Sequence, residues 1–343
     1  MDVREQYLLL LLLLLIFIII IVILTTNAGI PSNNSVAIIS TDNHLSIEPI
    51  NDDLGMFNIS VKKSPQGYSG LIRGCTWNIC RTENTQPIFS YPYYINLDNE
   101  GKIVDLHRID LDYEDFVNCR KTSIYPNGIE DPRLFIFKDE EWAIANCLGS
   151  SKQEYPCSNA MCIFKLNNPR ETFKILTPPE GVGLKQVQKN WSPFEWNGKL
   201  LCEYTLEPHD IVEVDIDTGL STFLFTSGEE STDIIKEHSL RGGAPPILID
   251  TPGGKTFLSV GHTRIPKKGY VHFFYTFDPE PPFAITHISS LFKLENNDNI
   301  QFVTGLSIDS NDDPMIHISY GIDDCHNQIT KYPLSRVLLE LNY

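Results

Sequence analysis

The sequence predicts an all-β fold, a five-bladed β-propeller, with a transmembrane helix at its N-terminus. Three observations carry this prediction. Residues 8–24 form one uninterrupted apolar run, the chain beyond residue 55 shows short β-rich runs without helical periodicity, and hairpins recur there at a nearly constant interval. The predicted organisation is therefore a membrane anchor at residues 1–24, a stem at 25–55 and a propeller at 56–343.

The N-terminal apolar run has the length of a short membrane span. Leu8–Leu24 contains 17 apolar residues, near the lower limit for a helix that crosses a bilayer. Arg4 precedes it, and the next basic residue is Lys62, so the charge bias predicts a cytosolic N-terminus and a type II signal anchor with the lipid bilayer as a partner. A cleaved signal peptide is the alternative. Either interpretation places the rest of the chain in the ER or Golgi lumen or outside the cell.

The region after the anchor is polar and lacks periodicity, as expected for a stem. Across the whole chain, 27 basic residues face 44 acidic ones, which gives a net charge of −17. Because nucleic acid requires a concentrated positive surface, this balance argues against a nucleic-acid partner. A single small phosphate in a local pocket stays compatible with it, since such a site needs only a few cations.

Eight cysteines suit an oxidising compartment. None forms a CxxC pair and no histidine lies at zinc-ligand spacing from them, so neither a metal site nor a cofactor is expected. Cys75 with Cys80, and Cys157 with Cys162, are spaced to close short loops as disulfides, although sequence alone leaves the connectivity open.

N-glycosylation sequons begin at Asn33, Asn58 and Asn190, which predicts a glycoprotein. The sequons at Asn58 and Asn190 lie where the arguments below place the active face of the protein.

Hairpins divide the rest of the chain into similar units. Turn centres near residues 140, 198, 254 and 312 lie 58, 56 and 58 residues apart, and Asn197-Gly198 is a strong hairpin turn. An earlier hairpin turns at 62–67, after a longer interval of about 73 residues. A repeat of this size is typical of a propeller blade, and five hairpins indicate five blades. A two-sheet sandwich is the alternative, but it would not require so even a period. The expected strand pairs are 57–61 with 68–73, 134–137 with 142–147, 193–196 with 199–204, 247–249 with 255–262, and 306–308 with 314–320.

Polar residues lie at one end of every predicted hairpin, before its first strand and after its second. If these strands are the innermost of each blade, the polar residues converge at one end of the central channel. Acids, cations and aromatic rings from five segments would then line one pocket. The clusters are 57–58 and 73, 130–133 and 146, 189–192 and 203–204, 241–246 and 261–264, and 304–305 and 319–324.

The segment Gly128–Arg133 concentrates the chemistry, because two carboxylates, a proline and a guanidinium are consecutive. Pro132 favours an extended conformation of Asp131. Arg133 could pair with one carboxylate while the other serves in acid–base chemistry. A structural ion pair that closes a β-turn is the alternative.

These motifs resemble the β-mannoside phosphorylases of glycoside hydrolase family 130 and the related β-1,2-mannosyltransferases. The similarity extends over roughly residues 55–330, in the order of the family. The motifs that carry it are 57–58, 67–73, 128–133, 242–246, 261–262 and 320–324. The resemblance implies a five-bladed propeller whose site lies in the axial channel.

The resemblance also implies an inverting reaction in which Asp131, beside Glu130, is the general acid and acts through a hydroxyl of the bound mannose. A phosphorylase needs cations that hold phosphate, whereas an inverting hydrolase needs a second carboxylate as base. The candidate phosphate-binding residues are Lys189, Arg241, His262 and Arg264. The candidate sugar-binding residues are Asn58, Arg73, Arg133, Asn190, Trp191, Tyr204, Tyr320 and Asp324.

Several of these residues have a simpler alternative. Lys189 and Arg264 also suit exposed loop charges, and His262 on an apolar strand also suits a core histidine. The Lys189–Ser192 cluster and Arg241 differ from the phosphate-binding residues of the bacterial enzymes in this family. The adjacent pair Asp323-Asp324 leaves open which of the two acids binds sugar.

Three functions remain open. The first is a membrane-anchored enzyme that transfers mannosyl groups to or from a phosphate or a sugar-phosphate donor, with a mannose-containing glycan as its other partner. The second is an inverting β-mannoside hydrolase with Glu203 or Glu207 as base. The third is a propeller that binds glycans without catalysis. The sequence does not identify the donor, the acceptor, the linkage or the oligomeric state.

Overall fold

A computed structural model describes residues 36–39, 44–47, 54–76, 89–111, 127–148, 159–182, 187–228, 239–266, 269–296 and 300–343. The chain divides into Met1–Val36 and Ala37–Tyr343, and the elements described below belong to the second unit. The predicted anchor at 8–24 lies outside the described residues. Within the described ranges, no helix has the length and apolar character needed to span a bilayer.

The described part of the chain is all-β, and its strands form antiparallel units that each contain one predicted hairpin. The first unit holds β3 (Gly55–Ser64), β4 (Gly67–Cys75), β5 (Phe89–Leu97) and β6 (Ile103–Arg108). The second holds β7 (Asn127–Phe137), β8 (Glu140–Leu148), β9 (Asn159–Lys165) and β10 (Lys174–Leu176), and a short parallel pairing of β5 with β7 joins these two units into one eight-stranded sheet.

Three further units follow in chain order. The third consists of β11 (Ser192–Trp196), β12 (Lys199–Leu206), β13 (His209–Val214) and β14 (Ser221–Ser227). The fourth contains β15 (Ile247–Thr251), β16 (Gly254–Ile265), β17 (Gly269–Phe277), β18 (Ile285–Ile288) and β19 (Phe292–Lys293). The fifth contains β20 (Gln301–Ile308), β21 (Met315–Ile322) and β22 (His326–Pro333). Two short helices, α2 (Pro169–Thr172) and α4 (Leu334–Glu340), complete the described elements.

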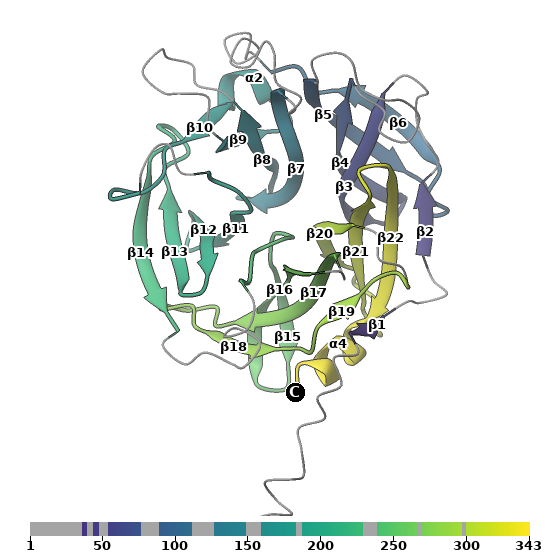
Figure 1. The fold of residues 1–343 in the computed structure, drawn as a ribbon, viewed down its shortest axis with the longest axis vertical. Coiled ribbons are helices and arrows are strands. Elements are labelled where there is room, and N and C mark those ends of the chain that lie inside the picture. The colour runs from purple at the N-terminus through teal and green to yellow at the C-terminus, as the bar shows by residue number, and fades with distance from the viewer. Residues whose placement is uncertain are drawn as a thin grey trace, which may run out of the picture. The chain divides into compact units, whose positions relative to one another are not determined.

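The five units follow one another around a common axis (Figure 1). One cavity of about 360 Å³ is lined by residues of β3, β7, β11, β15 and β20, which are the first strands of the five predicted hairpins. The first strands therefore surround one axis, as the repeat predicted. The arrangement is propeller-like, and all five predicted hairpins are confirmed.

The folded region begins earlier than the predicted boundary at residue 56. Two strands, β1 (Ala37–Ile38) and β2 (His44–Ile47), lie within the predicted stem. β1 pairs with β19 in parallel, and β2 pairs antiparallel with β22, so β2 is the outer strand of the fifth unit. These two segments, of two and four residues, are too short for a strand prediction, and pairing with β19 and β22 stabilises them.

The disulfide considered between Cys157 and Cys162 does not form, because Cys162 is a buried thiol, and Cys75 is a buried residue at the end of β4. Cys162 lies in β9, where its neighbours are core side chains such as Cys147 and Phe164. Their expected partners Cys80 and Cys157 lie outside the described residues. Loop spacing could not show that the two described cysteines point into a sheet interior.

Candidate active site

The Glu130–Arg133 segment of β7 is bulged. The pairing of β7 with β8 shifts register between Glu130 and Arg133, and Asp131 has a φ of 50°. The expectation of an extended Asp131 is therefore wrong, because the bulge holds this residue in the left-handed region despite the following proline. A second bulge near the start of β3 gives Asn58 a φ of 58°. The two bulges re-aim Asn58 and Asp131 toward each other.

Arg73 of β4 connects the two carboxylates of the motif. Its Nη1 donates to Asp131 Oδ1 at 3.0 Å, and its Nη2 lies 3.3 Å from Glu130 Oε1. Its Nε donates to Ser90 Oγ at 2.9 Å, and the guanidinium carbon lies 4.8 Å from the centre of the Phe57 ring. The side chain is only 7% exposed, so solvent screens these ion pairs little. Arg73 is thus the cation that holds both carboxylates.

Arg133 has a different role from the one its place in the motif suggested. Its side chain is buried, and its Nη1 donates to the carbonyl oxygen of Gly243 at 2.5 Å. Burial lowers the pKa of Arg133 to about 10, while the negative charge of Asp131 opposes this change. Arg133 therefore links β7 of the second unit to the loop before β15.

Asn58 brings a third carboxylate into the site. Its Nδ2 donates to Asp131 Oδ1 at 2.8 Å and lies 3.4 Å from Asp324 Oδ1. A Cβ at Gly321 would lie 2.0 Å from Asn58 Oδ1, so the position of this amide requires glycine there. Of the two adjacent acids, Asp324 contacts the Asn58 amide, whereas Asp323 accepts a hydrogen bond from the backbone N–H of Ile300.

The two aspartates have opposite electrostatic environments. Burial alone would raise the pKa of Asp131, but Arg73, the Asn58 amide and Lys189 together lower it below its ordinary value. Burial, followed by the charge of Asp131, raises the pKa of Asp324. The carboxyl that holds a proton more readily in the resting site is therefore Asp324.

A cavity of about 420 Å³ opens beside these carboxylates and contains two of the predicted phosphate-binding cations, Lys189 and Arg241. Lys189 Nζ lies 3.8 Å from Glu130 Oε2, and its side chain is 40% exposed. Glu207 is exposed on the same cavity wall. The lining residues are Val187, Gln188, Lys189, Asn190, Trp191, Tyr204, Thr205, Leu206, Glu207, Ser239, Leu240, Arg241 and Gly242.

Three predicted sugar-binding residues also lie on this cavity wall. The rings of Trp191 and Tyr204 meet edge to face, with their centroids 5.1 Å apart. Trp191 is almost fully buried, whereas Tyr204 is partly exposed. Asn190, which has a φ of 62°, precedes them. Tyr204 is therefore the ring of this pair that can contact a ligand, with Trp191 packed behind it, and an aromatic ring next to cations suits a sugar that carries a phosphate.

Three other candidates do not reach the cavity. Tyr320 is fully buried, and its hydroxyl lies within 2.9 Å of a Glu295 oxygen and 2.8 Å of a Gln328 oxygen, so it cannot form a stacking wall. His262 packs edge-on against Tyr270, and burial lowers its pKa to about 3, so it is neutral near pH 7 and supplies no cation. Arg264 is exposed near the end of β16, outside the lining of this cavity.

Sequence reasoning placed Asn146 at a strand end but did not select it as a site residue. Asn146 Nδ2 donates to Glu130 Oε2 at 3.3 Å, so Glu130 has three partners, namely Arg73, Lys189 and Asn146. The register of β8 against β7 sets Asn146 opposite Glu130. The turn alone would set Glu130 opposite Cys147, and the bulge shifts the register by one residue, so the predicted hairpin could not have identified this pairing.

Glu203 is not available as the base of a hydrolase. Its Oε1 lies 2.9 Å from His209 Nε2, and Tyr275 donates its hydroxyl to Oε2 at 2.9 Å. His209 Nδ1 is also 2.7 Å from the carbonyl oxygen of Phe283, so both ring nitrogens of His209 and both carboxylate oxygens of Glu203 have partners. All these side chains are buried, and the network ties β12 and β13 to the fourth unit.

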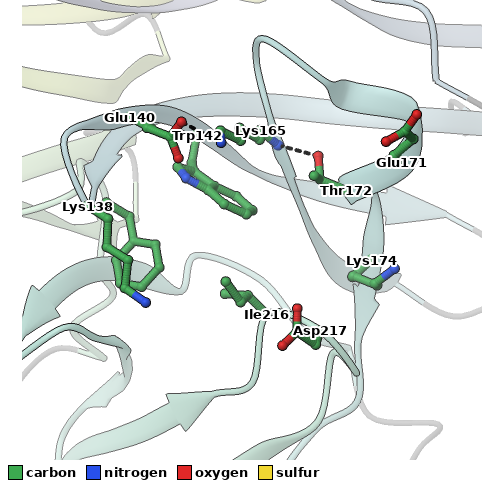
Figure 2. Close-up of a pocket in the computed structure, with 10 residues that line it drawn as sticks. Lys138, Glu140, Trp142, Lys165, Glu171, Thr172, Lys174, Ile216 and Asp217 are labelled. Atoms are coloured by element: carbon green, nitrogen blue, oxygen red, sulfur yellow. Dashed lines mark hydrogen bonds and ion pairs between the residues drawn. The ribbon is translucent and has the colours of Figure 1, made fainter.

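A second charged cavity, of about 290 Å³, lies at the opposite end of β7, near the β7–β8 turn (Figure 2). Lys165 there pairs with Glu140 across the Trp142 ring, while Lys138 and Lys174 lie on either side of the cavity. Its three lysines are matched by three carboxylates. It therefore lacks the excess of positive charge that a phosphate requires, and we assign the candidate site to the cavity at Lys189 and Arg241. Within the described ranges, no group of three His, Cys, Asp or Glu side chains could hold a metal ion.

The comparisons with known proteins support this fold. No protein-family model matches the sequence, and no curated protein does. Among solved structures, the chain is similar to a β-1,2-mannobiose phosphorylase from Listeria innocua in complex with β-1,2-mannobiose, with a TM-score of 0.56 and 16% identity over 88% of this chain and 99% of that one.

Two further structures have the same fold. One is a glycosyl hydrolase from Bacteroides ovatus, with a TM-score of 0.52 and 17% identity over 83% of this chain and 90% of that chain. The other is MPT-1, a GDP-Man-dependent mannosyltransferase from Leishmania mexicana, with a TM-score of 0.51 and 10% identity over 84% and 88% of the two chains. The predicted resemblance to the mannoside phosphorylases and mannosyltransferases is thus confirmed for the fold.

Proposed function

We propose that this protein is an inverting mannosyl-transferring enzyme whose donor or acceptor carries phosphate, that Asp131 is its general acid, and that its five units are the blades of a five-bladed propeller. The observation that carries the proposal is the contact of Lys189 with Glu130. This contact joins a carboxylate pair held by Arg73 to a cavity that contains a second cation, Arg241. Acid and anion-binding groups must be neighbours in a reaction that exchanges a glycosidic oxygen for a phosphate oxygen.

In this site, each group has a defined task. Asp131 would pass a proton to the departing oxygen, and Arg73 and Asn58 fix its carboxylate. Asp324 and the ring of Tyr204 would orient the mannose ring. Lys189 and Arg241 would hold the phosphate.

The similar structures support this class of substrate. One of them was solved with β-1,2-mannobiose, and another is described as dependent on GDP-Man. A hydrolase would need a carboxylate base in place of cations, and with Glu203 enclosed, Glu207 is the exposed carboxylate that the described part of the chain places on the cavity wall. We therefore favour transfer to or from phosphate over hydrolysis.

We further propose that residues 8–24 anchor the chain as a type II signal anchor and that the catalytic unit is lumenal or extracellular. The 17-residue apolar run and the single preceding arginine support this topology. Protease protection of the unit beyond residue 36 in sealed membranes would test it, and digestion without detergent by a protease on the cytosolic side would contradict it.

The enzymatic test uses the full chain and two donors, mannose 1-phosphate and GDP-mannose, with a panel of mannosyl acceptors. Release of phosphate or GDP together with a new β-mannoside is the expected result, and Asp131→Asn should abolish it while sugar binding persists. Hydrolysis of a β-mannoside without phosphate would favour Glu207 as base. Sugar binding without turnover, unchanged in Asp131→Asn, would identify a glycan-binding propeller.

A further inference from the structure

One cation, Lys189, lies close to the carboxylates of the site and also lines the cavity. Glu130, Asp131 and Asp324, here called the carboxylate cluster, face two nearby cations, Arg73 and Lys189. Arg73 is enclosed and hydrogen-bonded, whereas Lys189 is 40% exposed and lines the cavity. At 3.8 Å from Glu130 its ammonium is beyond hydrogen-bond distance, so it can turn to an anion in the cavity without breaking a hydrogen bond.

We infer that an anion of the phosphate class, when it binds in the cavity at Lys189 and Arg241, draws one proton from solvent into the carboxylate cluster. This inference rests on the proposed function, because it uses the same phosphate site. A bound dianion offsets the charge of Lys189 and adds its own negative potential, and both effects favour a neutral carboxyl. The proton comes from hydronium or the buffer acid: one O–H (or N–H) bond of that donor breaks, and one carboxyl O–H bond forms.

Asp324 is the member of the cluster that takes up this proton first. Its pKa is already raised by burial and by Asp131, whereas that of Asp131 is lowered by the nearby cations and amide. The Asn58 amide contacts both carboxylates through one nitrogen, at 2.8 Å and 3.4 Å, so the protonated group lies next to the general acid.

The other charged groups around the cluster do not account for such an uptake. Arg133, with a pKa of about 10, stays charged, and His262, with a pKa of about 3, stays neutral between pH 5 and 8. Tyr275 stays neutral because burial raises its pKa well above the ordinary value. Among the residues that the structure describes on the cavity wall, Glu207 is the competing acceptor, since it is exposed and lines the same cavity.

The experiment measures proton uptake when sulfate binds to the full chain. Sulfate mimics the phosphate dianion and does not itself titrate in this range, so any proton taken up belongs to the protein. Calorimetric titration at about pH 5.5, in two buffers with different heats of ionisation, yields the number of protons. We expect uptake of a large fraction of one proton and an affinity that increases roughly three- to tenfold between about pH 7.5 and pH 5.5.

Two variants identify the acceptor. Asp324→Asn should abolish the uptake, and Glu207→Gln, the matched control in the same cavity, should retain it. Sulfate that binds equally at both pH values, without proton uptake, would overturn the inference and leave the phosphate site intact. Uptake that persists in Asp324→Asn and disappears in Glu207→Gln would also overturn it. Failure of both sulfate and inorganic phosphate to bind would overturn the inference and the proposed phosphate site together.

Discussion

Replacement of Arg73 by methionine tests the electrostatic centre of the site. The change leaves Glu130 and Asp131 without the enclosed cation that contacts both, at 3.3 Å and 3.0 Å. Removing one partner of a buried ion pair typically costs about 3–5 kcal/mol. Since the Asp131 side chain is 24% exposed, we expect the lower end of this range, about 3 kcal/mol near pH 7.

The pH dependence of this loss follows from the sign of the pKa change. Because the pKa of Asp131 is lowered in the folded protein, its interaction with Arg73 stabilises the fold above the unfolded-state pKa. That contribution is lost as the pH falls through the lower, folded-state pKa. The difference in stability between wild type and Arg73→Met should therefore be full at about pH 7 and narrow strongly at about pH 3.

Urea unfolding measures this difference directly. For a unit of this size, a loss of about 3 kcal/mol corresponds to a decrease of about 1 M in the urea midpoint. The matched control is Arg108→Met, because Arg108 is an exposed arginine that lies over the Tyr91 ring, and its replacement should change stability by less than about 1 kcal/mol. A difference between wild type and Arg73→Met of equal size at both pH values would refute the reasoning.

Three further predictions concern the surroundings of the site. Glu203→Gln should lower the free energy of unfolding by about 2 kcal/mol, because it disrupts the buried hydrogen bonds of this carboxylate with His209 and Tyr275; an unchanged melting temperature would contradict this network. Gly321→Ala should reduce turnover about 100-fold by displacing Asn58, and unaltered turnover would show that the amide does not position the acid. Tyr320→Phe should leave KM within about twofold and cost about 1 kcal/mol of stability; a large rise in KM would restore Tyr320 as a sugar-binding residue.

Local sequence was sufficient to locate the hairpins. Asn197-Gly198 adopts the turn expected of it, with φ values of 49° and 74°, and the flanking apolar runs became β11 and β12. Turn residues and alternating apolar side chains act over a few neighbouring positions, so their effect can be recognised without the fold. The even spacing of the turns then indicated units repeated around an axis.

The sequence also singled out two carboxylates, Glu130 and Asp131, and the cations Lys189 and Arg241, because these residues recur at equivalent hairpin ends. It could not select among residues on the two faces of a strand. Tyr320 and His262 lie on strands that belong to the series, but their side chains point into the core. A shift of one residue in the backbone changes the face that a side chain occupies, and bulges introduce such shifts.

By itself, the sequence determined the all-β class, the positions of the five hairpins and the end of each hairpin at which chemistry concentrates. Only the tertiary structure decided which charges meet. Arg73 lies 58 residues before Asp131, and Asp324 lies 266 residues after Asn58. Contacts over such separations depend on how the five units close around the axis, and no local preference encodes that closure. The choice of Arg73 over Arg133 as partner of the carboxylates follows from this long-range geometry.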